Sequence, residues 1–256
     1  MSRVQFENRA GVRLIGNLEM STRDKPRASA VFAHCFTCGR DIRAAREITA
    51  RLADAGFAVL RFDFTGLGES EGDFADTHFS SNLDDLEDAA SWLAKELAPP
   101  QLLVGHSLGG AACLAVTERI DSVRAVATIG APSTPDNVIR HFDDRVDEIM
   151  QEGSAEVELA GRRFRIRRDF IEDARNHDLG ERLRQLGRSL LVMHSPVDRV
   201  VSIDHAQRIF SAAKHPRSFI SLDDADHLLS DPADAHWAAA IIAAWAARFV
   251  NGNQDG

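Results

Sequence analysis

The sequence predicts an α/β protein with a mostly parallel central sheet that is covered by helices on both faces. Two observations lead to this fold class. Short apolar runs recur along the chain with little polar alternation, which is typical of strands buried on both faces. Longer segments with helical periodicity lie between these runs, so strand and helix take turns as they do in parallel sheets.

The individual elements follow from local patterns. Two alternating stretches, 4–6 and 14–18, flank Asn8-Arg9-Ala10-Gly11 and predict an opening β-hairpin. Buried strands are expected further along the chain at 29–36, 57–64, 101–106, 123–130, 189–195 and 217–222. Helices are expected at about 41–55, 81–97, 108–119, 203–213 and 233–249. Because ligands bind at the carboxyl ends of parallel strands, residues that follow the strands are the first candidates for a functional site.

Residues 132–188 interrupt the alternation of strand and helix. They open with APSTPDN, continue with an acidic amphipathic stretch and an alternating segment at 158–170, and close with the helix-like stretch IEDARNHDLGERLRQLG. We interpret this interval as an inserted cap over the carboxyl edge of the sheet. Residues 1–131 and 189–250 then form the core that carries the cap, and residues 251–256 form a polar tail.

The composition favours a soluble protein that acts on small molecules. Hydrophobic residues make up 44% of the chain and charged residues 27%, as in ordinary globular domains. The formal net charge of −9 would repel a phosphate backbone, so we expect no nucleic-acid partner. The amino terminus lacks an apolar signal segment, and the longest apolar run, 237–247, is too short to span a bilayer. We therefore expect a cytoplasmic protein without a membrane role, and its oligomeric state stays open.

A candidate catalytic residue lies where the strand QLLVGH runs into the helical segment SLGGAACLAV. The pattern G-x-S-x-G at this junction, residues 105–109, indicates a nucleophile elbow when it lies between a strand and a helix. Small flanking residues permit a strained turn that lifts the serine hydroxyl above the sheet edge. An ordinary strand-to-helix turn is the alternative, and the context favours the elbow. Ser107 is therefore the candidate nucleophile.

A serine nucleophile needs a base, and the base needs an acid that orients it. In sheets that carry this elbow, the usual chain order is serine, acid, histidine. Asp198 follows the expected strand 189–195 and His227 follows the expected strand 217–222, so both lie in loops at the correct edge. We interpret them as the acid and the base. The competing residues are interpreted as turn, packing or solvated residues: Asp223, Asp224, Asp226, His177, His194, His205, His215 and His236.

A tetrahedral intermediate also needs hydrogen-bond donors for its oxyanion. In this architecture one donor is the amide of the residue after the nucleophile, here Leu108, and the second lies in a loop after an earlier strand. That loop is AHCFTCG, in which Phe36 is the expected second donor. Asp63, in RFDFTGLGESEGDF, also follows a strand at this edge, and we expect it to tie its loop with hydrogen bonds rather than to act as the acid.

The AHCFTCG loop carries a C-x-x-C pair, Cys35 and Cys38, beside His34. A zinc site would need a second ligand pair, and a thioredoxin-like centre would need a different fold, so no metal is expected. Three cysteines without a signal segment fit a reducing compartment. Two interpretations stay open. Either a disulfide forms reversibly, reshapes the short loop and inhibits the protein, or the cysteines pack as small apolar side chains.

The cap segment GRRFRIRR predicts a strand with Phe164 and Ile166 on one face and Arg163, Arg165 and Arg167 on the other. The arginines either form the solvated face of a hairpin, or one of them reaches the cleft. An arginine in the cleft would favour substrates that bear a carboxylate.

Several phrases of the chain, AHCFTC, RFDFTGLGESEGDF, GHSLGG, HSPVDRVV and SLDDADHLL, resemble the α/β-hydrolase superfamily in its serine esterase and serine aminopeptidase-like branch. The resemblance runs through nearly the whole chain. It points to the hydrolase domain of bacterial proteins that often carry a C-terminal domain of the osmotically inducible protein C type. The sequence stops at ARFVNGNQDG, so we expect that second domain to be absent here.

The resemblance implies the α/β-hydrolase fold, with Ser107, Asp198 and His227 as nucleophile, acid and base. It also implies an oxyanion hole made by the amides of Phe36 and Leu108. Dehalogenases and epoxide hydrolases resemble this fold but use aspartate at the elbow. We therefore expect a carboxylesterase that cleaves small esters through an acyl-enzyme, without a cofactor. A thioesterase or serine peptidase would use the same groups, and a redox or binding module on this scaffold would leave them unused.

Overall fold

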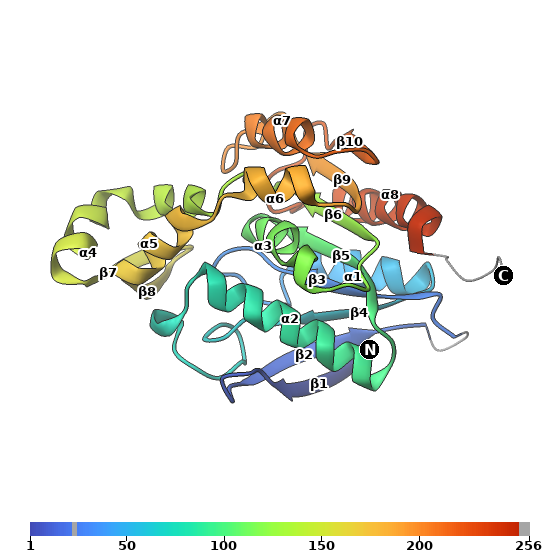
Figure 1. Cartoon of the computed structure of the whole chain (residues 1–256), viewed down its shortest axis with the longest axis horizontal. Helices are drawn as coiled ribbons and strands as arrows, with labels where there is room; N and C mark the ends of the chain where they lie inside the picture. The colour runs from blue at the N-terminus through green and yellow to red at the C-terminus, as the bar shows by residue number, and fades with distance from the viewer. Residues whose placement is uncertain (22–24, 251–256) are drawn as a thin grey trace.

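The computed structural model, which describes residues 1–21 and 25–250, contains an eight-stranded central sheet (Figure 1). Its strands are β1 Ser2–Glu7, β2 Arg13–Glu19, β3 Ala28–Ala33, β4 Phe57–Phe62, β5 Pro100–His106, β6 Ala125–Ile129, β9 Ser189–His194 and β10 Arg217–Ser221. Their order in the sheet is β1-β2-β4-β3-β5-β6-β9-β10. The β1–β2 and β2–β4 pairs are antiparallel, and the other pairs are parallel. The predicted fold class, a mostly parallel sheet, is confirmed.

Four of the inner strands are buried along their whole length, which explains their continuous apolar runs. Every residue of β3, β4, β6 and β9 is buried. Along β3, Ala30 and Phe32 pack into the core on one face of the sheet, and Val31 and Ala33 pack into the core on the other. β3 and β4 end before the apolar runs do, because the chain leaves the sheet there to form loops at its carboxyl edge.

Helices cover both faces of the sheet (Figure 1). Helices α1 (Arg43–Asp54) and α8 (Pro232–Val250) pack against each other on one face. On the other face lie α2 (Phe79–Glu96), α3 (Leu108–Val116) and α7 (Ile203–Ala212). Among the described residues, no helix combines the length and apolar character that a bilayer-spanning segment requires.

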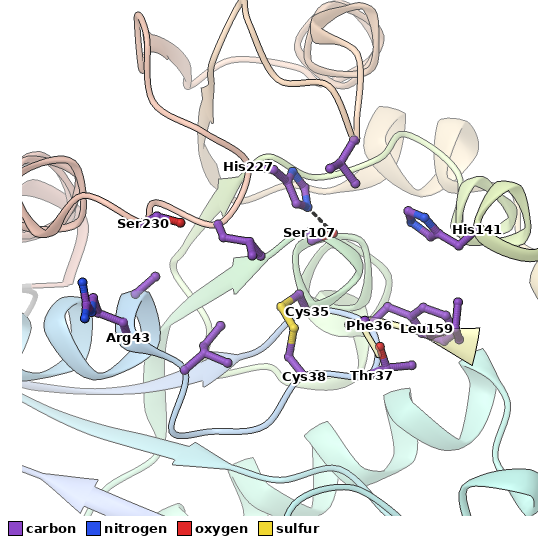
Figure 2. A pocket seen from close by; sticks show the side chains of 15 residues that line it. Cys35, Phe36, Thr37, Cys38, Arg43, Ser107, His141, Leu159, His227 and Ser230 are labelled. Atoms are coloured by element: carbon purple, nitrogen blue, oxygen red, sulfur yellow. Dashed lines mark hydrogen bonds between the residues drawn. A yellow bond between two sulfur atoms is a disulfide. The ribbon is translucent and has the colours of Figure 1, made fainter. Parts of the chain in front are cut away.

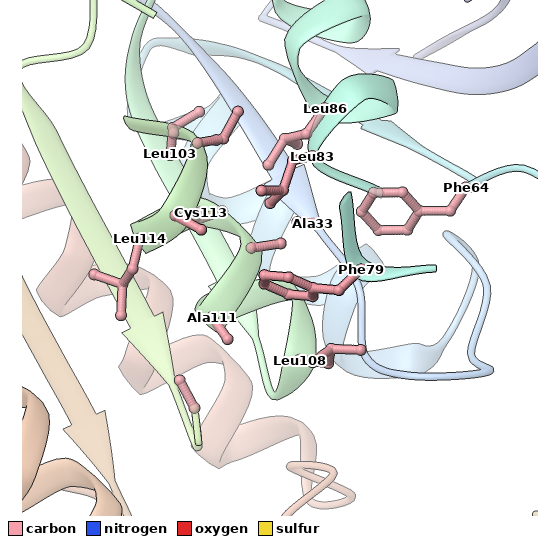
Figure 3. Close-up of a cluster of buried hydrophobic side chains, with 14 of the residues drawn as sticks. Ala33, Phe64, Phe79, Leu83, Leu86, Leu103, Leu108, Ala111, Cys113 and Leu114 are labelled. Carbon is pink, nitrogen blue, oxygen red and sulfur yellow. The ribbon is translucent and has the colours of Figure 1, made fainter. Parts of the chain in front are cut away.

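The core between α2, α3 and the sheet holds the start of α3 in place. Figure 3 shows Phe79 of α2 beside Ala111 of α3, with Leu83 of α2 above them, and all three are buried. Burial of a large apolar side chain such as Phe79 or Leu83 contributes about 1.5–3 kcal/mol. Every residue of α3 is buried, so this helix cannot shift without opening the core. Ser107, directly before α3, is therefore held on a rigid support.

The interval between β6 and β9 forms short elements, most of them beyond one end of the α2–α3 layer (Figure 1). Its β7–β8 hairpin is not part of the central sheet. Along the second strand of this hairpin Ile166 is buried and Arg163 and Arg165 are exposed, as the alternation predicts. The elements are η3 Pro135–Arg145, α4 Val146–Glu152, β7 Ser154–Leu159, β8 Arg162–Arg167, α5 Arg168–Asn176 and α6 Leu179–Gln185. The last of these, α6, packs against α3 and α7 and so belongs to the helix layer of the core.

The helix-like stretch that closes this interval is two helices rather than one. α5 ends at Asn176 and α6 begins at Leu179. Between them, the Asp178 carboxylate accepts hydrogen bonds from the amides of Gly180 and Glu181, at 2.8 and 3.3 Å, and so caps α6. Two further short turns, η1 Phe74–Asp76 and η2 Thr117–Arg119, lie outside this interval. The expected polar tail, 251–256, lies outside the described residues.

Candidate active site

Ser107 lies at the tip of a tight turn between β5 and α3. Its φ of 54° and ψ of −127° are rare for a residue other than glycine. A Cβ on Gly105 would lie 2.4 Å from the Gly109 carbonyl oxygen, and a Cβ on Gly109 would lie 2.4 Å from the Ala33 carbonyl oxygen. Glycine at both positions therefore lets the helix approach the sheet this closely. The result is the strand-turn-helix geometry that a nucleophile elbow requires.

Three loops at the carboxyl edge bring Ser107, His227 and Asp198 together. His227 Nε2 lies 3.0 Å from Ser107 Oγ (Figure 2), and His227 Nδ1 lies 2.7 Å from Asp198 Oδ2. Asp198 Oδ1 also accepts hydrogen bonds from the amides of Val200 and Val201, at 2.8 and 2.9 Å. An imidazole held in this way can take the proton of the serine hydroxyl, while the carboxylate stabilises the resulting imidazolium.

The surroundings of Asp198 keep its carboxyl group ionised. Burial by itself raises the pKa of Asp198, but hydrogen bonds from His227 and from the amides of Val201 and Val200 outweigh burial. The pKa therefore lies below its ordinary value, and Asp198 is charged at neutral pH. A charged carboxylate next to Nδ1 favours the tautomer of His227 that leaves Nε2 free to accept a proton.

A second histidine, His106, supports the loop that carries His227. His106 Nε2 donates a hydrogen bond to the His227 carbonyl oxygen at 2.7 Å. Burial, with a smaller contribution from His227, lowers the pKa of His106 to about 4, so this ring is neutral at pH 7. Sequence reasoning missed this role, because His106 occupies the variable position of G-x-S-x-G.

The competing residues near the site have other partners. The Asp226 carboxylate accepts a hydrogen bond from the Ser230 amide at 2.9 Å. His194 lies 3.6 Å from Asp198, but its Nε2 makes a closer hydrogen bond to the Val201 carbonyl oxygen at 2.8 Å. These contacts are those of a turn residue and a packing residue.

Asp63 ties two loops together beneath the site. Its Oδ1 accepts a hydrogen bond from the Arg40 amide at 2.6 Å, and its Oδ2 accepts one from the Glu69 amide at 3.0 Å. The Arg40 guanidinium also pairs with this carboxylate. Gly68 passes so close that a Cβ there would lie 2.2 Å from the Asp63 carboxyl group, which explains the glycine. Asp63 is a structural residue of these loops.

The AHCFTCG loop forms a β-turn from Cys35 to Cys38. The Cys38 amide donates a hydrogen bond to the Cys35 carbonyl oxygen at 3.2 Å, and Thr37 has a positive φ of 56°. A disulfide joins the two ends of the turn, whose Cα atoms are 5.3 Å apart. Because this separation is within the range that disulfides adopt, the turn itself brings the sulfurs together. The β-turn accommodates the bridge, and the expectation that closing it reshapes the loop stays a prediction.

Phe36 and Leu108, the residues whose amides are the expected oxyanion donors, both line a small void behind the AHCFTCG loop. Within the part of the chain that the structure describes, neither backbone amide donates a hydrogen bond. Both amides are therefore available to a bound anion.

The AHCFTCG loop packs against η1 and against residues of the 132–188 interval. The Phe36 ring packs against Phe74 of η1 and Phe170 of α5, with ring centroids 5.9 and 5.6 Å apart. The guanidinium of Arg162, at the start of β8, donates a hydrogen bond to the Thr37 carbonyl oxygen. Two elements of this interval thus contact the loop that carries Phe36.

Ser107 and His227 open into a pocket of about 580 Å³, a volume suited to a small organic ligand (Figure 2). Its walls come from the AHCFTCG loop, the start of α1, the 132–188 interval and the loops after β9 and β10. Most of the wall is apolar. The residues that line it are Cys35, Phe36, Thr37, Cys38, Ile42, Arg43, Ala44, Ser107, His141, Leu159, Ala160, Val200, His227, Leu228 and Ser230.

The arginines singled out in the GRRFRIRR segment lie outside this wall. Arg165 pairs with Glu156 at 3.4 Å, and Arg167 pairs with Asp76 at 2.6 Å. They form the solvated face of a hairpin, the first of the two alternatives. The arginine that does line the pocket is Arg43, which no pattern in the sequence distinguished. Within residues 1–21 and 25–250, no three His, Cys, Asp or Glu side chains are grouped as a metal ion would require.

Comparisons with known proteins agree with the fold. A family model described as the alpha/beta hydrolase family matches residues 30–248. The crystal structure of the esterase domain of a Rhodothermus marinus protein is 44% identical, covers 97% of this chain and 98% of that chain, and has a TM-score of 0.79. The mouse alpha/beta hydrolase domain-containing protein 10 is 22% identical over 97% of this chain and 99% of its own, with a TM-score of 0.75.

A curated relative is similar over a shorter length. The mitochondrial palmitoyl-protein thioesterase ABHD10 of Rattus norvegicus is 27% identical over 71% of this chain. The match spans 62% of that relative's length. A protein of Escherichia coli K12 without an assigned activity, YfhR, is 24% identical over 88% of this chain and 72% of its own.

Proposed function

Because this chain belongs to the alpha/beta hydrolase family, we propose that it is a serine hydrolase, and specifically a carboxylesterase that cleaves small esters. The hydrogen-bonded series from Ser107 through His227 to Asp198 carries the proposal, with distances of 3.0 and 2.7 Å. The 44% identity to the Rhodothermus marinus esterase domain supports ester chemistry. The proposed partner is a small ester that enters the pocket beside Ser107.

The reaction begins with acylation of the serine. His227 Nε2 takes the Ser107 hydroxyl proton as Oγ attacks the ester carbonyl carbon, and the charged Asp198 stabilises the imidazolium. His227 then gives this proton to the leaving alcohol, the ester bond breaks, and the acyl group stays on Ser107. In deacylation His227 takes a proton from water, which attacks the acyl carbon. His227 returns the proton to Ser107 Oγ, and the free acid leaves.

The backbone amides of Phe36 and Leu108 are the proposed oxyanion donors. Negative charge develops on the carbonyl oxygen in each tetrahedral intermediate, and two amides that have no other partner among the described residues can bind it. Leu108 is the first residue of α3, so the positive end of the helix dipole adds to this attraction. One such donor contributes roughly 10²–10³-fold in kcat.

A thioesterase is the second candidate. The identity of 27% to a palmitoyl-protein thioesterase favours it. The same three side chains would act, because both reactions pass through an acyl-enzyme and differ in whether an alcohol or a thiol leaves. The apolar wall, which includes Leu159, Val200 and Leu228, suits an acyl chain in either case.

Covalent labelling with a fluorophosphonate tests the proposal. We expect the label on Ser107 and its loss in Ser107→Ala, together with a fall in kcat of about 10⁴-fold or more on a short-chain 4-nitrophenyl ester. Ser230→Ala is the matched control, because Ser230 also lines the pocket and should not be needed for labelling. Labelling or most of the activity surviving in Ser107→Ala would reject the serine mechanism. Absence of labelling in the wild type would favour a binding or redox module.

The leaving group is decided by a separate comparison. An oxygen ester and a thioester with the same acyl group are offered to the wild-type protein. A higher kcat/KM for the oxygen ester supports the carboxylesterase, and a higher value for the thioester supports the second candidate.

A further inference from the structure

The charges on the wall of the Ser107 pocket are unbalanced. The chain as a whole carries 39 acidic residues against 30 lysines and arginines. Among the described residues that line the pocket, however, none is acidic, and Arg43 is the only lysine or arginine. His141 adds no positive charge at neutral pH, because burial, with a smaller contribution from His227, lowers its pKa. A ligand in this pocket therefore meets one permanent positive charge and no negative one.

Arg43 is not neutralised by its neighbours. The nearest acidic side chains along the chain have other partners, since Asp41 pairs with Arg61 at 2.9 Å and Glu47 pairs with His236 at 2.6 Å. In the part of the chain that the structure describes, the Arg43 guanidinium makes no hydrogen bond or ion pair. Its donors are therefore free for a ligand.

The position of Arg43 in the pocket suits the far end of a substrate. In the view of Figure 2, Arg43 and His141 lie on opposite sides, with Ser107 and His227 between them. Arg43 is the first residue of α1, whose first turn contains no acidic residue. The positive end of this helix dipole adds to the charge on the same wall. An ester bound at Ser107 can extend one end toward this wall.

We propose that Arg43 is a specificity-determining residue that binds a carboxylate of the substrate, so that the protein prefers anionic esters. This inference rests on the proposed hydrolase function. A guanidinium binds a carboxylate through two parallel N–H···O hydrogen bonds, which orients the ligand as well as attracting it. The carboxylate belongs either to the acyl half or to the alcohol half of the ester. Both sources share the same recognition chemistry.

Two matched pairs of esters test the subsite and distinguish these sources. The acyl pair is the 4-nitrophenyl monoester of suberic acid and its methyl-capped diester. The alcohol pair is 4-carboxyphenyl octanoate and its methyl ester. In Arg43→Gln we expect kcat/KM to fall about fivefold for the anionic member of one pair, mainly through KM. The neutral members should change by less than about twofold. The pair that responds identifies the half that carries the carboxylate.

Arg46→Gln is the matched control, because Arg46 lies on the same helix but does not line this pocket. We expect it to leave both pairs unchanged. Equal losses for the anionic and neutral members in Arg43→Gln overturn the subsite, and so does an equal loss in Arg46→Gln. A wild type that hydrolyses the neutral esters without preferring the anionic ones rejects the subsite and leaves the hydrolase proposal intact.

Binding of the product acids gives a readout that does not depend on turnover. Suberate carries a second carboxylate that octanoate lacks, and isothermal titration calorimetry compares their affinities. We expect Arg43→Gln to weaken suberate binding about fivefold and to leave octanoate binding unchanged. The alcohol half is tested in the same way with 4-hydroxybenzoate, the alcohol product of the second pair. Equal affinities of the wild type and Arg43→Gln for both suberate and 4-hydroxybenzoate overturn the subsite. If no ester is hydrolysed and Ser107 is not labelled, the proposed function fails, and the calorimetric result still decides the role of Arg43.

Discussion

The Nδ1 atom of His227 lies 2.7 Å from Asp198 Oδ2, although 29 residues separate them in the chain. Asp226, the residue directly before His227, bonds instead to the Ser230 amide at 2.9 Å. Neighbouring residues in a turn point their side chains in different directions, so proximity in sequence does not select the acid. The loops after β9 and β10 bring the Asp198 carboxylate, and not that of Asp226, next to His227 Nδ1.

Asp198→Asn is expected to lower kcat for ester hydrolysis by about 10⁴-fold, because an amide at this position favours the wrong tautomer of His227. Steady-state kinetics on a 4-nitrophenyl ester measures the effect. Asp226→Asn is the control and should change kcat by less than about tenfold, since this carboxylate contacts a turn amide. A large loss in Asp226→Asn with a small one in Asp198→Asn would reassign the acid.

Arg162→Gln is expected to lower kcat and to leave KM almost unchanged. The Arg162 guanidinium bonds to the Thr37 carbonyl oxygen, next to the proposed oxyanion donor Phe36. We expect a loss of about tenfold, less than the roughly 10²–10³-fold of a missing donor, because Arg162 acts by positioning the loop. Arg162→Lys, which retains a donor and the charge, should recover part of the rate.

Arg163→Gln is the control for this positioning role, because Arg163 lies next to Arg162 but on the exposed face of β8. Binding of a phosphonate transition-state analogue gives a second measurement. Its affinity should fall with kcat in Arg162→Gln, while the affinity for the product acid stays constant. An equal effect in Arg163→Gln, or a rise in KM alone, contradicts the positioning role.

Buried His106 is expected to make the protein less stable in acid. Its pKa is about 4 in the folded protein, against an ordinary value of 6.5. Between these two values the unfolded chain binds a proton that the folded chain does not, so the free energy of unfolding falls as the pH falls. Over the whole interval from pH 6.5 to pH 4, this loss in the free energy of unfolding is about 3 kcal/mol. Among the described residues His106 Nδ1 has no hydrogen-bond partner, which explains why a proton there is unfavourable.

Urea denaturation at several pH values between 6.5 and 4 measures this effect. His106→Gln is the matched variant, because glutamine retains a donor for the His227 carbonyl oxygen but does not titrate. We expect the variant to lose less stability than the wild type over this window. Identical pH dependence in the two proteins would exclude His106 as the source.

The disulfide between Cys35 and Cys38 is expected to stabilise the protein more than it controls activity. The hydrogen bond from the Cys38 amide to the Cys35 carbonyl oxygen closes the same turn without the sulfurs. Reduction should therefore leave kcat of the same order, while a switch that removed an oxyanion donor would change it by roughly 10²–10³-fold. We expect a loss of about 2 kcal/mol in stability on reduction, from the chain entropy of a short loop.

Activity and thermal unfolding before and after a thiol reductant test this expectation, with Cys38→Ser as the control. Cys113 should not interfere, because it is buried and burial raises the pKa of its thiol. A large, reversible change in the wild type that is absent from Cys38→Ser would instead establish the redox switch.

Local patterns in the sequence predicted the elements well, because a residue's burial follows the period of its own helix or strand. The alternation along β8 placed Ile166 inside and Arg165 outside, as observed. The same alternation could not say where the solvated face of that hairpin points. It therefore left open whether one of the three arginines reaches the cleft, while the arginine that lines the pocket is Arg43.

The sequence by itself determined the fold class and the candidate residues Ser107, Asp198 and His227, because strand order and the elbow glycines place these residues at one edge of a parallel sheet. Only the tertiary structure decided which residues support them. The hydrogen bond from His106 to the His227 carbonyl oxygen joins residues 121 positions apart, and the one from Arg162 to Thr37 joins residues 125 positions apart. Such contacts depend on how whole loops pack against each other, and no periodicity within a single element encodes that packing.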